Sequence, residues 1–545
     1  MWQHNYMPVG GSLGLSTVVA AIPLLVLFYM LGVKRKPSWM AALTALGVAW
    51  LVALVAYRMP FQQAFASTIY GAAFGMFPIA WIVFTSILLY RLTVDTGKFE
   101  IIKDWVAGLT NDRRLQALFI AFSFGAFIEG AAGFGAPVAI SAAMLAGLGF
   151  SPFYAAGICL LANTAPVAFG SIGIPVVTLA GITGLPVLSL SAMVGRVCAM
   201  VSVIIPTYLV LVMAGLGGAL EILPAIVACG ATFAGVQFFV SNYLGPELTD
   251  ILSALTSIAA MVLVIKVWHP KNIFRLAGDT PVTTAPKQHR GGEAFMAWVP
   301  YLLLVVFVLA WGYPPIKAVL DKLTVVINVP GLHRTILRVP PVTRAAEPYA
   351  AQFTLNWLSA SGTSCFLATA SAALVLGVKP GRFWGIYKAT NKQLAFPMLT
   401  IASMLGLAYL MNYSGMTSTL GLALATSGPV FPFFSSILGW IAVFLTGSDT
   451  SANALFGNLQ VVTANALGIN PVLTASVNSA GGVMGKMISP QSIAVAVAAT
   501  GMTTADEGKL FRFTLRHSIF LASVIGLIAL GYAYLAPQWI PSATR

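Results

Sequence analysis

Charged side chains are scarce in this sequence. Asp, Glu, Lys and Arg make up 8% of the 545 residues, whereas 58% are hydrophobic, and a soluble globular domain carries about 25% charged residues. So few ionic groups cannot cover a folded surface that faces water. The composition therefore excludes an ordinary soluble domain and predicts a membrane protein.

Histidine and cysteine are also rare, which excludes the common metal and redox sites. The five histidines form no HExxH motif and the four cysteines form no CxxC motif, so neither residue type offers a zinc site. The cysteines lie far apart in apolar segments, and we expect them to be packing residues rather than disulfide partners. They are Cys159, Cys198, Cys229 and Cys365.

A phosphate-binding loop is missing as well. Lys486 follows Gly485 as at the end of such a loop, but the next residue is Met487 rather than Ser or Thr. We therefore expect no cofactor, no metal, no enzyme activity and no pumping driven by nucleotide hydrolysis. The net charge of +14 would suggest nucleic acid in a soluble protein, but the basic residues fall in short loops between apolar segments. We expect a lipid environment and no nucleic-acid partner.

Apolar stretches of 18 or more residues recur along the chain, and each can cross a hydrocarbon core of about 30 Å as a helix. We predict an all-α polytopic membrane protein with about 12 transmembrane helices plus re-entrant hairpins. The candidate spans are 12–32, 39–57, 66–90, 192–216, 222–244, 248–268, 295–313, 357–378, 394–412, 430–447 and 518–536, with glycine-rich regions at 115–185 and 448–500.

Basic loops orient the chain, because cytoplasmic loops near helix ends collect Lys and Arg. Counting crossings from Lys34-Arg35-Lys36 places 20 of the 29 basic residues on one face, which we take as the inside. The loop 314–356 disagrees, since it carries five basic residues on the predicted outer side. It is long, and long outer loops tolerate such charge.

The two glycine-rich regions resemble each other. Residues 147–152 (GLGFSP) return as 466–471 (ALGINP), and residues 163–175 (NTAPVAFGSIGIP) return as 478–490 (NSAGGVMGKMISP). Glu129 lies 320 residues before Asp449. The loop before Glu129 is basic and inside, whereas the loop before Asp449 is uncharged and outside, so the copies enter the membrane from opposite faces.

Inverted repeats of this kind are typical of secondary transporters, whose halves move around a site near the midplane. We predict a first inverted repeat at 1–220, linking helices and a basic cytoplasmic loop at 221–294, and a second inverted repeat at 295–545.

Both regions place an acid beside backbone that makes a poor continuous helix, Glu129 in a run of glycines and Asp449 among hydroxyl and amide residues. Broken backbone at membrane depth lines a cavity or is packed in protein, and an ionisable group there costs roughly 3 kcal/mol. We predict that Glu129 and Asp449 are proton-coupling acids, because a carboxyl group away from water can cycle between neutral and charged forms. The alternative is a loop position or a buried ion pair.

Lys486 is predicted either to bind substrate or to pair with one of these acids. Freed N–H groups at the helix breaks suit a carboxylate ligand, while neighbouring amides and hydroxyls either bind it or tie the broken helices together. The substrate-binding candidates are Gly133, Gly135, Asn163, Thr164, Ser448, Thr450, Ser451, Asn453, Asn478, Ser479, Lys486, Ser489 and Gln491. Glu247 and Asp250 are interpreted as part of an extramembrane turn.

Four motifs resemble bacterial L-lactate permeases: 129–140 (EGAAGFGAPVAI), 163–170 (NTAPVAFG), 444–456 (FLTGSDTSANALF) and 485–494 (GKMISPQSIA). The similarity runs over nearly the whole chain. It implies a multi-pass permease of the bacterial inner membrane for L-lactate, D-lactate and glycolate, with proton symport as the coupling. It also implies an ion-transporter-superfamily fold with inverted repeats, two re-entrant hairpins and an elevator-like motion.

Sodium coupling or facilitated transport of small carboxylates is the alternative within transport, and a membrane enzyme or channel is a remote one. The sequence specifies no oligomeric state.

Overall fold

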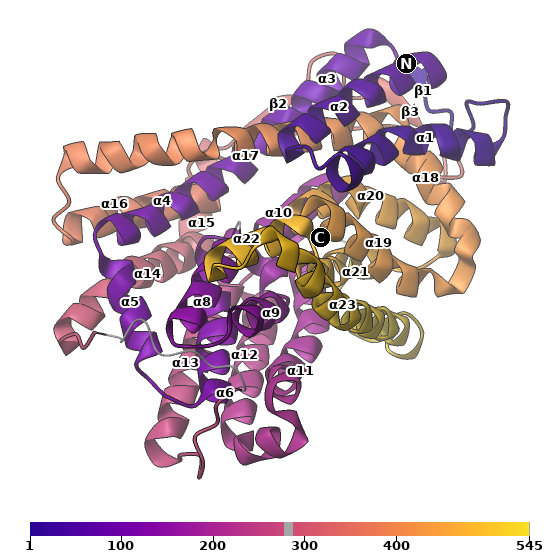
Figure 1. The fold of residues 1–545 in the computed structure, drawn as a ribbon. Helices are drawn as coiled ribbons and strands as arrows, with labels where there is room; N and C mark the ends of the chain where they lie inside the picture. Colours follow the sequence, from indigo (N-terminus) through magenta and orange to yellow (C-terminus); the bar gives the residue numbers. More distant parts are fainter. Residues whose placement is uncertain (134, 277–286, 544–545) are drawn as a thin grey trace.

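The computed structural model describes residues 1–133, 135–276 and 287–543. The predicted basic loop therefore lies partly outside the described residues, between 277 and 286. Within the described part, 11 helices are long and apolar enough to cross a membrane, or 12 if one bent pair counts as a single span. The prediction of an all-α polytopic membrane fold is confirmed (Figure 1).

The long helices follow the order of the apolar segments. In the first half they are Leu13–Val33 (with α1, Leu13–Phe28), Ser38–Ala56 (with α2, Ser38–Leu51), Phe61–Asp95 (with α3, Phe61–Phe74, and α4, Trp81–Asp95), Arg113–Ala131 (with α6, Arg113–Gln116, and α7, Gly125–Ala131) and Val187–Glu221 (α11). They continue with Leu223–Tyr243 (α12), Thr249–Val267 (α13), Gly291–Gly312 (α14), Pro380–Ser414 (α17), Met416–Thr446 (with α18, Met416–Leu424, and α19, Phe431–Thr446) and Thr504–Leu535 (with α23, Glu507–Leu530). The remaining α-helices are Lys98–Ala107 (α5), Ala136–Gly147 (α8), Pro152–Ala162 (α9), Gly170–Thr183 (α10), Pro314–Leu320 (α15), Ser361–Val375 (α16), Asp449–Leu467 (α20), Pro471–Lys486 (α21) and Pro490–Thr500 (α22).

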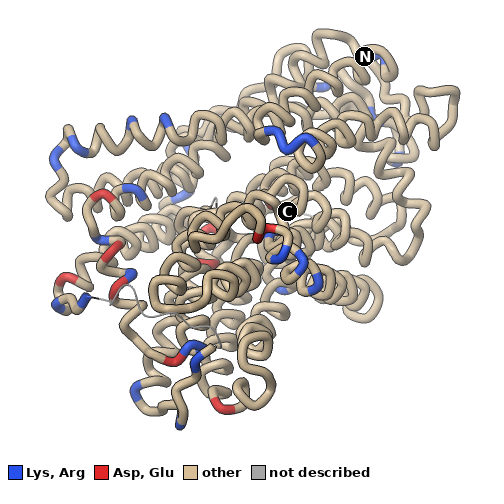
Figure 2. Tube along the Cα trace, in the orientation of Figure 1, with Lys and Arg blue, Asp and Glu red and all other residues tan. Residues whose placement is uncertain are grey.

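Several predicted spans are too short. The helices found for 66–90, 192–216 and 394–412 each contain 35 residues, because apolar runs mark only the part of a helix inside the hydrocarbon layer. The helix Phe61–Asp95 is also broken, since Phe77 before Pro78 has the extended angles φ −143° and ψ 123°. Figure 2 shows Lys and Arg gathered near helix ends and in loops.

A small β-layer in the predicted outer loop was not expected. The strand Trp2–Gln3 (β1) pairs in parallel with Ile336–Arg338 (β3), which pairs antiparallel with Glu347–Pro348 (β4). Val325–Asn328 (β2) pairs antiparallel with Gln352–Leu355 (β5). The N-terminus and the loop 314–356 therefore lie together. The predicted orientation places both on the outer side.

Each glycine-rich region folds into a hairpin. In the first, Gly125–Ala131 (α7) ends at a turn, and α8 packs back along the residues that precede α7. In the second, Phe431–Thr446 (α19) ends at Gly447, and α20 packs back on α19. A broken helix follows each hairpin, α9 with α10 at a bend of 62° and α21 with α22 across residues 487–489.

Small residues bring the helices of the second region into close contact. A Cβ atom added to Gly439 of α19 would overlap the carbonyl oxygen of Asn478 on α21, and one added to Gly481 would overlap that of Ser436. Backbone-to-backbone packing of this kind is how membrane helices associate without a hydrophobic driving force. The α19–α21 pair therefore forms a rigid support under the second hairpin.

We predict that Gly439→Ala destabilises the fold, by about 1 to 3 kcal/mol as expected for overpacking. Thermal unfolding of the purified protein in detergent measures the effect. The matched control is Gly235→Ala in α12, where an added Cβ meets nothing within 4 Å; it should leave stability unchanged or raise it, because Ala is about 1 kcal/mol better than Gly in a helix. Equal midpoints for the two variants would contradict the close packing.

Candidate functional site

A cavity lies where the two hairpin turns and the two helix breaks meet. Its volume is about 200 Å³, and residues from all four interruptions line it. Pockets for drug-sized ligands measure about 300 to 1,000 Å³, so this one suits a molecule of only a few heavy atoms. The glycine-rich regions, far apart in sequence, thus build one site.

Four helices begin at this cavity. Gly135 precedes α8 and has a left-handed φ of 84°, Gly170 begins α10, and Ser448 caps α20. Ser492 stands in the first turn of α22, and all four residues line the cavity. Helix N-termini carry free N–H groups and a partial positive charge, so their convergence favours an anion.

The break at the start of α10 is strained. Ser171, Ile172 and Gly173 have φ angles of 46°, 61° and 73°, a left-handed run that L-residues with side chains rarely adopt. The Ser171 hydroxyl donates to the Ala132 carbonyl at 3.0 Å, which ties the break to the first hairpin turn. The neighbouring Gly133 has to lack a side chain, because a Cβ there would overlap Ser171 Oγ.

Lys486 supplies the positive charge of the cavity. Its Nζ donates to the Gly447 carbonyl at 2.6 Å, which connects the end of α21 to the second hairpin turn. The ammonium group also interacts electrostatically with Glu129 and Asp449. Lys486 lines the cavity together with both acids, so the predicted alternatives of pairing and substrate contact are compatible.

Asp449 lies in a hydrogen-bonded network. Its Oδ2 accepts hydrogen bonds from Ser479 Oγ at 2.5 Å and Asn453 Nδ2 at 3.3 Å, and its buried Oδ1 has no partner within the described residues. Asn453 also donates to the Pro175 carbonyl at 3.1 Å and accepts from Asn478 Nδ2 at 3.0 Å. The two amides hold the acid and the helix breaks in register.

Glu129 is held differently. Its side chain is 5% exposed and lies against Gly170, where an added Cβ would be 2.6 Å from Oε1. Among the described residues, Oε2 has no hydrogen-bond partner, and neither polar atom of the buried Asn163 has one. The buried acid of the first half therefore lies beside the buried Asn163 amide.

The predicted site residues divide into two groups. Those that line the cavity are Glu129, Gly135, Ser448, Asp449, Thr450, Lys486 and Gln491. Those placed outside its lining are Gly133, Asn163, Thr164, Ser451, Asn453, Asn478, Ser479 and Ser489.

Their contacts account for most of the second group. The Thr164 hydroxyl donates to the Leu161 carbonyl, Ser451 donates its backbone N–H to Ser448 Oγ, and Ser489 caps α22 through the Ser492 N–H. Asn453, Asn478 and Ser479 belong to the Asp449 network. A direct substrate contact for any of them remains a prediction.

The sequence interpretation missed several lining residues, Ser171 and Ser492 among them. Both lie inside the motifs used for the repeat and the family resemblance, so the signal was present. Ser171 directly follows Gly170, and Ser492 lies three residues after Ser489, the N-cap of α22; each position faces the site only because a helix begins there.

A second cavity lies on the other side of the first hairpin turn. It measures about 580 Å³ and is lined by Gly133 and Ala136 of the turn together with Arg91 and Arg382. Arg382 pairs with Asp95 at 2.6 Å. The hairpin turn therefore separates the small cavity from a larger one that contains two arginines.

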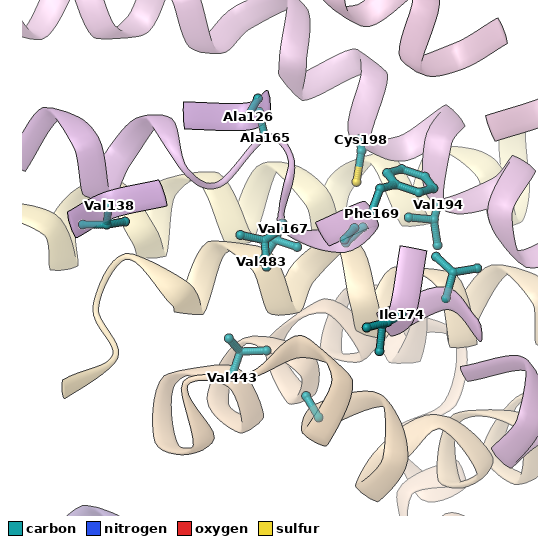
Figure 3. Close-up of a cluster of buried hydrophobic side chains, with 14 of the residues drawn as sticks. Ala126, Val138, Ala165, Val167, Phe169, Ile174, Val194, Cys198, Val443 and Val483 are labelled. Atoms are coloured by element: carbon teal, nitrogen blue, oxygen red, sulfur yellow. The ribbon is translucent and has the colours of Figure 1, made fainter. Parts of the chain in front are cut away.

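An apolar cluster forms the wall between the halves. Figure 3 shows Val167 and Ile174 from the first half together with Val443 and Val483 from the second. Val167 and Ile174 also line the small cavity. One side of the cavity is thus apolar, while the helix N-termini and Lys486 occupy the other.

The burial of Asp250 is not what the interpretation as part of an extramembrane turn suggests. The turn before α13 exists, but Asp250 is 1% exposed, and a Cβ added to Gly130 would lie 2.8 Å from Asp250 Cβ. Gly245 and Pro246 precede the acid and are typical of an exposed polar turn. The turn is buried because the first hairpin packs against it, which the local sequence does not encode. The four cysteines, in contrast, are buried as expected.

The fold and the site define a multi-pass membrane transport protein. The sequence profile described as L-lactate permease matches residues 16–536. The L-lactate permease of Bacillus subtilis (strain 168) is 48% identical over 568 residues, which cover 99% of this chain and 100% of that protein. The chain belongs to the L-lactate permease family, which confirms the resemblance and a transporter rather than an enzyme.

A second relative carries a different name. The glycolate permease GlcA of Escherichia coli (strain K12) is 46% identical and covers 98% of each chain. Among solved structures, the YdaH transporter of Alcanivorax borkumensis aligns with 96% of this chain and 100% of that chain, at 13% identity and a TM-score of 0.42. That structural similarity is too low to carry an argument.

We predict that cysteines introduced at Ser448 and Thr450 react with a water-soluble thiol reagent, because both positions are partly exposed and line the cavity. The control is Ala452→Cys on the same helix, at a position that is fully buried. It should react at least about tenfold more slowly, since thiol reactivity requires access. Labelling rates followed by mass spectrometry measure this. The four native cysteines are buried, so the parent should give little background, and equal rates at 450 and 452 would contradict the cavity.

Proposed function

We propose that this protein is a secondary active transporter that imports L-lactate, and also D-lactate and glycolate, across the bacterial inner membrane by proton symport. The observation that carries the proposal is the small cavity in which one lysine and four helix N-termini face two buried acids. The family and the names of its relatives support the substrate class.

The cavity matches the chemistry of a short 2-hydroxy acid. A carboxylate is attracted by Lys486 and by the helix N-termini. The hydroxyl groups of Ser171, Ser448 and Thr450 offer partners for a substrate hydroxyl, and Val167 provides an apolar surface for a methyl group. Glycolate, which lacks the methyl group, fits the same arrangement.

Charge balance supports the proton. With both acids ionised, Lys486 leaves the site with one excess negative charge, which repels an incoming anion at low local dielectric. One bound proton brings the net charge of the site to zero and removes this repulsion, and one proton bound together with one anion leaves the total charge of the site unchanged. Substrate binding and proton binding therefore favour each other, which is the condition for symport.

The boundaries of the helices support two related halves at 1–220 and 295–545. The 35-residue helix Phe61–Asp95 corresponds to Pro380–Ser414. Further along, the starts of α9, α10 and α11 at 152, 170 and 187 correspond to those of α21, α22 and α23 at 471, 490 and 507. Each pair differs by 319 or 320 residues, the spacing found for the two acids.

We propose that these halves are inverted repeats that expose the site alternately to either face. The cavity with Arg91 and Arg382 belongs to the inner side in the predicted orientation. Arg91 gives this cavity a positive charge in addition to the Arg382–Asp95 pair.

The proposal is tested with purified protein in proteoliposomes. A pH gradient, acidic outside, should drive accumulation of labelled L-lactate in the complete absence of sodium. Unlabelled D-lactate and glycolate should compete. Accumulation that requires sodium, or uptake that only equilibrates, would refute proton symport and favour sodium coupling or facilitated transport.

Removal of the cavity's cation should weaken substrate binding. We predict that Lys486→Ala raises the apparent KM for L-lactate about tenfold to hundredfold, because a hydrogen bond to a charged group contributes about 1.5 to 3 kcal/mol. The control Lys509→Ala removes an exposed lysine that pairs only with Asp506 among the described residues, and its KM should equal that of the parent. An unchanged KM for Lys486→Ala would make this residue a structural partner of Gly447.

The two acids should be required for coupling but not for binding. We predict that Glu129→Gln and Asp449→Asn abolish accumulation driven by a pH gradient and retain part of the exchange of internal for external lactate, since a neutral amide mimics the protonated acid but cannot release the proton. Both assays use the same proteoliposomes. If both variants accumulate lactate like the parent, neither acid carries the proton.

A further inference from the structure

The turn between α12 and α13 packs against the first half of the site. A Cβ atom added to Gly173, in the break of α10, would lie 2.7 Å from Pro246, and one added to Gly130 would lie 3.0 Å from Ile251 Cγ1. The linking helices are therefore in direct contact with both interrupted elements of the first half. Asp250, in the first turn of α13, is placed beside the residue that follows Glu129.

The carboxyl group of Asp250 is buried without hydrogen bonds to offset its loss of hydration. Its side chain is 1% exposed, and neither carboxyl oxygen has a hydrogen-bond partner within residues 1–133, 135–276 and 287–543. A buried carboxylate that lacks both a counter-ion and hydrogen bonds costs several kcal/mol. A purely structural acid would be expected to have at least one partner, so Asp250 needs another explanation.

The groups around Asp250 include other acids but no cation among the described residues. Glu129 on α7 interacts with it electrostatically, and Cys198 on α11 lies within range of both Asp250 and Asp449. A further titratable group packed on α13 is Cys229 of α12, which accepts a hydrogen bond from Ser257 Oγ at 3.4 Å. Lys486 interacts with Glu129 and Asp449.

A partly exposed acid lies at the start of the same turn. Glu247 accepts a hydrogen bond from Ser361 Oγ at 3.0 Å and interacts with Lys317. In the predicted orientation this turn belongs to the outer side. Glu247, Asp250 and Glu129 therefore form a sequence of carboxyl groups from the outer surface to the cavity.

We propose that Asp250 is a proton-transfer residue that delivers the coupled proton from the outer side to Glu129. The protonated Asp250 gives its proton to the ionised Glu129: the O–H bond at Asp250 breaks, one forms at Glu129, and the Asp250 carboxylate takes a new proton from a hydronium ion of the outer solution, which becomes water. Two like charges side by side in a buried place cannot both persist, so the pair shares a proton at every stage. This inference rests on the proposed proton symport.

The test separates net transport from exchange. Asp250→Asn, in full-length protein in proteoliposomes, should slow uptake of L-lactate driven by a pH gradient about tenfold or more. Positioned acid–base groups typically contribute about a hundredfold or more to a rate. Exchange of lactate at equal pH should continue at nearly the parent rate, because Glu129 need not gain or lose a proton in each cycle. Asp250→Glu, which keeps the carboxyl group, should restore much of the net uptake.

The control is Ser253→Ala, one turn further along α13, where the buried hydroxyl only donates to the Thr249 carbonyl; it should behave like the parent in both assays. Net uptake by Asp250→Asn at the parent rate would overturn the inference, and so would equal loss of uptake and exchange, which marks a structural role. A parent protein without uptake driven by a pH gradient would instead overturn the proposed function itself.

Discussion

Backbone groups released by a helix break cannot face lipid, and this constraint determines how the site is built. Three side chains donate hydrogen bonds to backbone carbonyl groups that the interruptions leave free: Ser171 to Ala132, Lys486 to Gly447 and Asn453 to Pro175. The Ser171 bond joins the first hairpin to the break in α10, and the Lys486 bond joins the second hairpin to the end of α21. The Asn453 bond connects the two halves, so the interruptions stabilise one another and the cavity forms between them.

The two halves satisfy this constraint in different ways. In the second half, hydroxyl and amide groups surround Asp449, and its Oδ2 accepts two hydrogen bonds. In the first half, glycines allow close approach instead, and Glu129 Oε2 lies buried with no such support among the described residues. The acids at corresponding positions therefore have different surroundings.

The sequence was sufficient for the helical membrane fold, the family and the two hairpin regions, because apolar length and the motifs around Glu129 and Asp449 are local signals. It also named seven residues that line the cavity. It could not distinguish Lys486, which lines the cavity, from Asn478, which lies behind it, because both are polar residues in the same motif. That distinction depends on which face of α21 packs against α19, through contacts such as that of Gly439 with Asn478.

Tertiary contacts decided the remaining differences. The β-layer requires pairing between the N-terminus and residues more than 300 positions later, which no local pattern encodes. The burial of Asp250 follows from the approach of Gly130, since a turn with Gly245 and Pro246 would otherwise be exposed. The left-handed angles at Ser171 likewise follow from the packing of the first hairpin turn.

The bond from Lys486 to the Gly447 carbonyl has a consequence for selectivity. The ammonium group has three N–H donors, and this bond occupies one of them. A bare halide meets the remaining donors as a single point charge, whereas a carboxylate with a neighbouring hydroxyl offers several acceptor atoms in fixed positions. A single side chain thus joins the turn of the second hairpin to whatever anion the cavity holds.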